Sequence, residues 1–184
     1  MSALSLVERI VAVHQALDGA GVPHAFGGAL SLAYHTNEVR ATKDIDVNVF
    51  VSPQDAERVL AALPDGVVSG ERDVHAILRD GQVRVWWDET PLDLFFDLHR
   101  VHHQAAEHAR IVPFADTELP VLGSTELTVF KMMFSRPKDW VDIEAMLEAG
   151  SVDTLAVDAA FGGIAGPDDE ALVRFHDLAR GYSA

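Results

Sequence analysis

The feature that most constrains this chain is a pair of carboxylates, Asp44 and Asp46, separated by a single isoleucine. Polar and apolar side chains alternate from Asp44 onward, which predicts a β-strand over residues 44–51 with one buried face. Side chains two positions apart in a strand project from the same face, so the two carboxylates should lie together. Two carboxylates on one face of a strand are suited to holding a divalent cation.

A glycine pair, Gly27-Gly28, precedes this strand and opens an apolar stretch, residues 29–35, which is typical of a buried helix. Glycine allows a ligand to approach the backbone closely, and the N–H groups at a helix N-terminus favour phosphate. The polar turn over residues 37–43 joins this helix to the acidic strand and carries Arg40. A phosphate site and a cation site are therefore predicted side by side.

The rest of the chain changes from mixed to helical character near residue 120. Further helices are expected at residues 4–17, 53–63, 125–134, 140–147 and 170–180, and a glycine-rich loop at 160–167. Further strands are expected at residues 24–26, 74–78, 82–87 and 92–98, with a hairpin turn at 79–81 and a break at 90–91. This pattern predicts an α+β fold: a mixed β-sheet core flanked by helices over residues 1–120, followed by a small helical region over residues 121–184.

A third carboxylate is available on the predicted strand at residues 92–98. Asp93 and Asp97 share one face of this strand with Phe95. An unpaired carboxylate among large apolar residues is costly to bury, so an aspartate here needs a cation or a hydrogen-bonding partner. Either Asp93 or Asp97 can supply that third group.

Composition narrows the class of partners. The formal net charge of −15, from 14 Lys and Arg against 29 Asp and Glu, argues against broad electrostatic attraction to nucleic acid. The absence of cysteine excludes disulfides and thiolate metal sites and fits a cytoplasmic protein, and oxygen ligands favour Mg²⁺ over Zn²⁺. No uncharged apolar run approaches the ~20 residues that a membrane span needs, so no membrane partner is expected.

In their order along the chain, Phe26-Gly27-Gly28, Asp44-Ile45-Asp46 and the distant Asp93 resemble the nucleotidyltransferase superfamily. Its motif combines an apolar residue and a glycine pair with Asp-x-Asp and a later carboxylate. The basic turn at residues 40–43, and Lys131 followed by the Lys138-Asp139 pair, most resemble the AbiEii-type toxins of abortive phage infection and type IV toxin–antitoxin systems.

This resemblance implies transfer of a nucleoside monophosphate from a nucleoside triphosphate (NTP) to a hydroxyl. Asp44, Asp46 and Asp93 are then the catalytic residues and the ligands of two Mg²⁺ ions. Asp93 is expected either to ligate the metal ion near the acceptor hydroxyl or to take its proton.

The resemblance also implies a set of nucleotide-binding residues: Gly27, Gly28, Arg40 and Lys131. The two glycines would expose backbone donors to the triphosphate, and the two cations would supply positive charge. For Lys131, a solvated lysine on an amphipathic helix is an equally good interpretation. Nearby, Asp139 and Asp142 are expected to have structural roles, as a helix N-terminal charge and as a partner for Lys138 or Arg136.

Three functions are compatible with these residues. The toxin-like branch implies an acceptor hydroxyl on RNA, such as transfer RNA, or on protein, together with a possible antitoxin partner. A small-molecule nucleotidyltransferase acting on aminoglycoside or lincosamide antibiotics also fits, since carboxylates attract cationic aminoglycosides. A catalytically silent homologue that binds nucleotide or a partner protein is the third, although the presence of Asp44, Asp46 and Asp93 favours an active enzyme.

Overall fold

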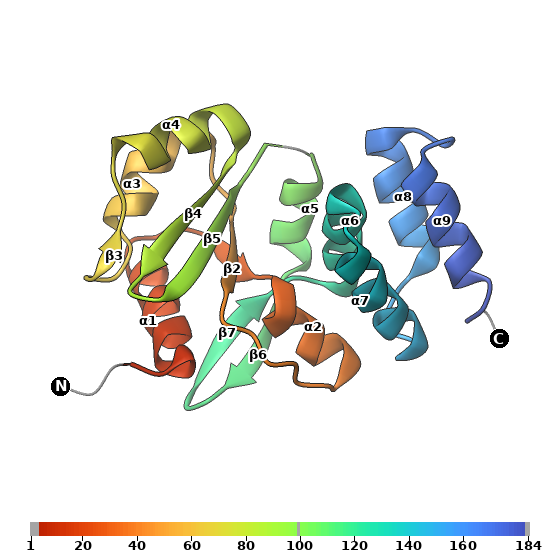
Figure 1. The fold of residues 1–184 in the computed structure, drawn as a ribbon, viewed down its shortest axis with the longest axis horizontal. Coiled ribbons are helices and arrows are strands. Elements are labelled where there is room, and N and C mark those ends of the chain that lie inside the picture. The colour runs from red at the N-terminus through yellow and green to blue at the C-terminus, as the bar shows by residue number, and fades with distance from the viewer. Residues whose placement is uncertain (1–3, 99, 183–184) are drawn as a thin grey trace.

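The computed structural model describes residues 4–98 and 100–182, and its strands form one mixed sheet (Figure 1). The strands are β1 His24–Phe26, β2 Ile45–Val49, β3 Val67–Val68, β4 Gln82–Trp87, β5 Thr90–Phe96, β6 Arg110–Phe114 and β7 Thr117–Val121. Their order across the sheet is β3-β4-β5-β2-β1-β7-β6. The β2–β5 and β1–β7 pairs are parallel and the remaining pairs are antiparallel. The predicted α+β fold with a mixed sheet is therefore confirmed.

Helices cover this sheet and continue beyond it toward the C-terminus (Figure 1). They are α1 Leu6–Gly19, α2 Gly28–Thr36, the 3₁₀ turn η1 Pro53–Asp55, α3 Ala56–Ala61, α4 Glu71–Asp80, α5 Arg100–His108, α6 Ser124–Phe134, α7 Pro137–Glu148, α8 Thr154–Ala165 and α9 Glu170–Ala179. None of the helices in the described residues is long and apolar enough to cross a bilayer.

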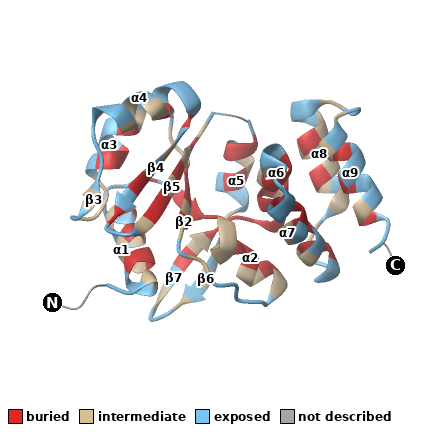
Figure 2. Cartoon of the chain, in the orientation of Figure 1, coloured by how far each residue is buried: buried red, intermediate tan, exposed pale blue. Residues whose placement is uncertain are grey.

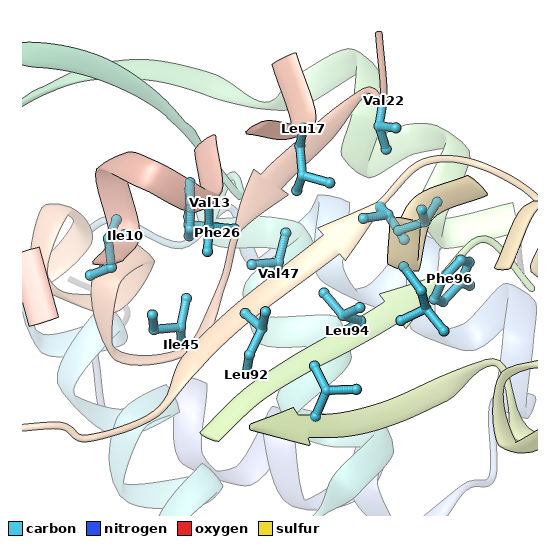
Figure 3. Packing of buried hydrophobic residues seen from close by; sticks show 14 of the residues in the cluster. Ile10, Val13, Leu17, Val22, Phe26, Ile45, Val47, Leu92, Leu94 and Phe96 are labelled. Carbon is cyan, nitrogen blue, oxygen red and sulfur yellow. The ribbon is translucent and has the colours of Figure 1, made fainter. Parts of the chain in front are cut away.

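A first apolar core lies between α1 and the central strands. Figure 3 shows Ile10, Val13 and Leu17 of α1 on the same side of the sheet as Val47 of β2, with Leu94 of β5 beside Val47. The α-helical spacing of the first three residues and the strand alternation around Val47 create two complementary apolar faces. Val47 lies on this buried face of β2, and Asp46 projects from the opposite face. Figure 2 shows that β2 and β5 are largely buried.

A second apolar core joins the C-terminal helices to the sheet domain. Met132, Trp140 and Phe175 belong to α6, α7 and α9, and they share this core with Ala25 and Leu32 from β1 and α2. The two sets of residues come from opposite sides of the predicted boundary at residue 120. The helical region is thus packed on the sheet domain, and its standing as a separate domain stays a prediction.

The predicted hairpin at residues 74–87 is wrong in its first strand. Residues 74–78 lie in α4, and Gly81 ends that helix in the left-handed conformation with φ of +67°. An Asp-Gly step serves a helix C-terminus as well as a hairpin turn, since both need positive φ. The hairpin instead joins β4 to β5 through Asp88 and Glu89, and Pro91, predicted to break the strand, pairs with Trp86 inside it.

Other parts of the chain also differ from the predictions, including β3 and α5, which were not predicted. Residues 160–165, predicted as a glycine-rich loop, form the end of α8, where Phe161 is buried against the second core. The β6–β7 hairpin was not predicted, because each of its short strands contains a proline, Pro113 or Pro120, and proline argues against a strand in sequence patterns.

Candidate active site

Three charged side chains lie in a row across three neighbouring strands. Asp46 of β2 is directly opposite Asp93 of the parallel strand β5, and Asp93 is directly opposite Arg84 of the antiparallel strand β4. Residues opposite each other in a ladder project from the same face of the sheet. The sheet itself therefore places two of the predicted carboxylates side by side and adds an arginine to them.

Arg84 contacts two of the three predicted carboxylates. Its Nε donates to Oδ1 of Asp93 at 2.7 Å and its terminal nitrogen donates to Oδ2 at 2.6 Å, which is a bidentate pair. The same terminal nitrogen lies 3.5 Å from Oδ2 of Asp44. Asp44 immediately precedes β2, and its N–H donates to the hydroxyl of Thr42. The guanidinium thus lies between the carboxylate of Asp93 on β5 and that of Asp44 just before β2.

Gly28 makes room for the carboxylate of Asp46. Gly28 has φ of +50°, and a Cβ at this position would lie 1.9 Å from Oδ2 of Asp46. The N–H of Gly27 donates to the backbone carbonyl of Asp46 at 2.9 Å. The glycine pair and the Asp-x-Asp strand are therefore one unit, in which the first turn of α2 lies against the acidic side chain.

The charge of Asp46 is unfavourable in this environment. Burial, together with the nearby Asp93 and Asp44, raises the pKa of Asp46 to about 6, and Lys131 and Lys138 oppose the shift. A carboxylate of this kind is stabilised by a cation. The carboxylate oxygens of Asp44, Asp46 and Asp93 are hard donors of the kind that Mg²⁺ prefers. Among the described residues no three acidic or histidine side chains already converge as a metal cage, and the group that contacts Asp93 is Arg84.

The two predicted triphosphate ligands, Lys131 and Arg40, meet at one carboxylate. The Nζ of Lys131 on α6 donates to Oδ2 of Asp142 on α7 at 2.7 Å, and Arg40 donates to Oδ1 of the same group. The predicted partner of Asp142, Lys138 or Arg136, is therefore wrong. Lys131 is almost fully buried, so the interpretation as a solvated lysine is also wrong. Through Asp142, the loop over residues 37–44 is tied to both helices.

Asp139 has the structural role predicted for it. Its buried carboxylate accepts from the backbone N–H of Arg136 and from two guanidinium nitrogens of the same residue. Burial alone would raise the pKa of Asp139, but these hydrogen bonds and the arginine charge hold it below its usual value. Asp97, the other candidate for the third carboxylate, lies beyond the end of β5 beside His103 and outside the row.

We call Asp44, Asp46 and Asp93 the acidic row. A cavity of about 550 Å³ opens beside it. It lies between α1, α2 and the loop over residues 37–44, and both Asp44 and Asp46 line it. Most of its wall is apolar, with the following residues among those that form it: Leu6, Val7, Ile10, Phe26, Ala29, Leu30, Ala33, Tyr34, Val39 and Phe114.

Sequence reasoning missed Arg84 and the true partners of Asp142. Arg84 is the only charged residue between Gln82 and Trp87, a signal that a buried or paired partner exists. Locating the tight turn at residues 88–89 would have placed Arg84 opposite Asp93. No local signal links Asp142 to Arg40, because 102 positions separate them.

Neither protein-family models nor curated proteins give a match to this chain. Solved structures do. The solution structure of the antibiotic-resistance factor ANT(2'')-Ia is 15% identical with a TM-score of 0.59, covering 96% of both chains. ANT(2")-Ia in complex with adenylyl-2"-tobramycin is 14% identical with a TM-score of 0.53, covering 96% of this chain and 95% of the other. An antigenic nucleotidyltransferase-like protein from Paracoccidioides brasiliensis is 13% identical with a TM-score of 0.50, covering 94% and 91%. At these identities the likeness shows the fold, and the fold of this chain is that of the nucleotidyltransferases.

Proposed function

We propose that this chain is a metal-dependent nucleotidyltransferase, which moves a nucleoside monophosphate from an NTP to an acceptor hydroxyl and releases pyrophosphate. The observation that carries the proposal is the register pair Asp46–Asp93, with Gly28 of α2 lying against Asp46. This places carboxylates and a glycine-initiated helix N-terminus together on a nucleotidyltransferase fold. Acids that hold a cation and backbone donors that receive phosphate are the two parts that phosphoryl transfer needs.

The three aspartates have separate roles in this proposal. Asp44 and Asp46 would hold the cations that accompany the triphosphate, and Asp93 would receive the proton of the acceptor hydroxyl or ligate the second ion. Bound Mg²⁺ would neutralise the charge that develops on the transferred phosphoryl group. The bond from the α-phosphorus to the bridging oxygen breaks as the acceptor oxygen bonds to that phosphorus, so pyrophosphate leaves.

The remaining site residues would bind the triphosphate. Gly27 and Gly28 offer backbone N–H groups at the N-terminus of α2. Lys131 and Arg40 would exchange the carboxylate of Asp142 for phosphate oxygens, which are equivalent acceptors for a lysine and a guanidinium.

A small molecule is the acceptor that we favour. The cavity beside Asp44 and Asp46 has the size of a small-molecule site, and the net charge of −15 disfavours a polyanionic acceptor such as RNA. The structures that resemble this chain along nearly its whole length include an enzyme bound to an adenylylated aminoglycoside. Transfer to RNA or protein, as in the toxin-like branch, is the alternative acceptor class.

Label transfer separates these functions. Each NTP, labelled at the α-phosphate, is incubated with Mg²⁺ and the protein, alone or with total RNA, aminoglycosides or lincosamides. We expect label on a small hydroxylated acceptor and a loss of at least about 100-fold in Asp46→Asn, the range found when an electrostatic catalytic group is removed. Asp158→Asn, which removes an exposed carboxylate paired with His176, is the matched control.

Two results would contradict the proposal in different ways. If no acceptor is labelled but NTP still raises the melting temperature in an Asp46-dependent manner, the chain is a silent nucleotide-binding homologue. If neither label transfer nor NTP stabilisation is observed, the nucleotidyltransferase proposal is wrong altogether.

A further inference from the structure

The guanidinium of Arg84 occupies the position where a cation would meet the third carboxylate. Both oxygens of Asp93 accept from it, at 2.7 and 2.6 Å, and it reaches within 3.5 Å of Asp44. Asp46 adds its negative field to that of the other two aspartates at Arg84. One positive charge thus already offsets part of the negative charge of Asp44, Asp46 and Asp93.

This pair differs from an ordinary surface salt bridge. Exposed ion pairs contribute little, because water screens both charges and both side chains lose entropy. Here the side chain of Asp93 is only 16% exposed, and its geometry with Arg84 is bidentate. Strand register also fixes both residues opposite each other, so little further ordering is needed to form the pair.

Arg84 and a divalent cation have conflicting requirements at Asp93. Two positive groups within a few ångströms repel each other, and a carboxylate engaged on both oxygens offers its remaining lone pairs less favourably. The side chain of Arg84 is 49% exposed, which leaves it room to turn outward from the sheet. Its departure would free Asp93 without moving a strand.

We propose that Arg84 competes with a divalent cation for Asp93 and thereby sets the cation affinity of the acidic row. Before cation binding the guanidinium offsets one of the negative charges of the three aspartates, and it leaves Asp93 when the cation arrives. Arg84 is accordingly a positioning residue, which acts through Asp93. This inference rests on the proposed metal-dependent function, and the binding measurement below needs neither nucleotide nor acceptor.

The test is the affinity of the protein for Mn²⁺, measured from the free-ion electron paramagnetic resonance signal. We expect Arg84→Gln to bind Mn²⁺ roughly tenfold more tightly than the wild-type chain, a typical coupling between two competing ligands. Arg79→Gln, which removes an exposed arginine that is bidentate to Asp80, changes the net charge equally and should leave the affinity unchanged. Equal or weaker Mn²⁺ binding by Arg84→Gln would overturn the proposal.

A double-mutant cycle shows whether the effect passes through Asp93. In an Asp93→Asn background, Arg84→Gln should no longer change Mn²⁺ affinity, because the contested group is gone. A tenfold gain that persists in this background would mean that Arg84 acts as a general charge, and the proposal would fail.

Melting temperatures give an independent measure. In EDTA, Arg84→Gln should melt below wild type because its carboxylates lack a counter-ion, and Mn²⁺ should stabilise it more than it stabilises wild type.

The outcomes also separate this inference from the proposed function. If Asp46→Asn abolishes Mn²⁺ binding but Arg84→Gln leaves the Mn²⁺ affinity unchanged, only the role of Arg84 is overturned. No Mn²⁺ binding by any variant would overturn the metal-dependent function together with it.

Discussion

At the scale of single residues, the site is shaped by what Gly28 and Asp46 require of each other. Gly28 combines positive φ with a space that the carboxylate of Asp46 already fills. The sequence predicted that glycine is needed here so that a phosphate can approach. In the structure, the atoms nearest to a Cβ at Gly28 belong to the side chain of Asp46. The same close packing removes water from Asp46 and contributes to its altered protonation.

Gly28→Ala should lower the free energy of unfolding by about 1–3 kcal/mol, because it adds backbone strain and displaces Asp46. Gly163→Ala is the matched control: Gly163 lies within α8 with open space around its Cβ position. We expect this control to stabilise the protein by about 0.5–1 kcal/mol, since alanine favours a helix. Urea denaturation measures both, and equal effects would contradict the steric role of Gly28.

The protonation of Asp46 predicts an unusual dependence of stability on pH. The folded pKa of about 6 lies above the ordinary aspartate pKa of 3.8, so the folded state binds the proton more tightly. Between these values the folded chain carries more protons than the unfolded chain, and stability falls as pH rises toward 6. In EDTA, Asp46→Asn should therefore exceed wild type by on the order of 2–3 kcal/mol above pH 7 and match it near pH 4. Parallel pH profiles of the two proteins, from urea denaturation, would disprove this assignment.

At the scale of elements, alternation and order along the chain predicted the acidic strand, the glycine-initiated helix and the strand that carries Asp93. These features depend on neighbours within a few positions, which sequence patterns report well. Register across the sheet depends instead on residues far apart in the chain. Because the hairpin turn was predicted at the wrong residues, the pairing of Arg84 with Asp93 was not found. Asp142 was misassigned for a similar reason, since its partners are supplied by tertiary packing of the loop over residues 37–44 against α6 and α7.

Asp142→Asn should loosen the loop over residues 37–44, because it removes the charge shared by Lys131 and Arg40. Charged hydrogen bonds contribute about 1.5–3 kcal/mol, so we expect trypsin to cleave after Arg40 at least roughly tenfold faster. Asp177→Asn, which removes an exposed partner of Arg180 on α9, should leave the cleavage rate unchanged. Equal rates in all three proteins would mean that Asp142 does not hold the loop.

At the scale of the whole molecule, the described residues contain two apolar cores that share the central sheet region. The first is built on α1 and the strands, and the second joins α2 and α5 to the C-terminal helices. Sequence patterns could not show that β1 and α2 contribute to the second core. Interdigitation of this kind favours one cooperative unit over two independent domains.

Phe175→Ala should lower the free energy of unfolding by about 3–5 kcal/mol, because Phe175 is fully buried. The two probes are compared in a Trp140→Phe background, where the fluorescence comes from Trp86 and Trp87 of the sheet. There, Phe175→Ala should lower the melting temperature measured by fluorescence as much as the melting temperature measured by the circular dichroism of the helices. Val173→Ala, on an exposed position of α9, is the control and should have little effect. Fluorescence that remains unshifted would show that residues 121–184 unfold separately.

The turn at residues 88–89 also has a consequence for the order in which the site assembles during folding. It brings Arg84 and Asp93 together across nine positions of chain, and hairpins of this size close within about 1–10 μs. Asp46 can join them only when β2 docks in parallel on β5. Asp46 and Asp93 are 47 positions apart in the chain, and such a long loop closes later than a hairpin. We therefore expect the neutral Arg84–Asp93 pair to form first, and the repulsion among the aspartates to arise later, when β2 docks on β5.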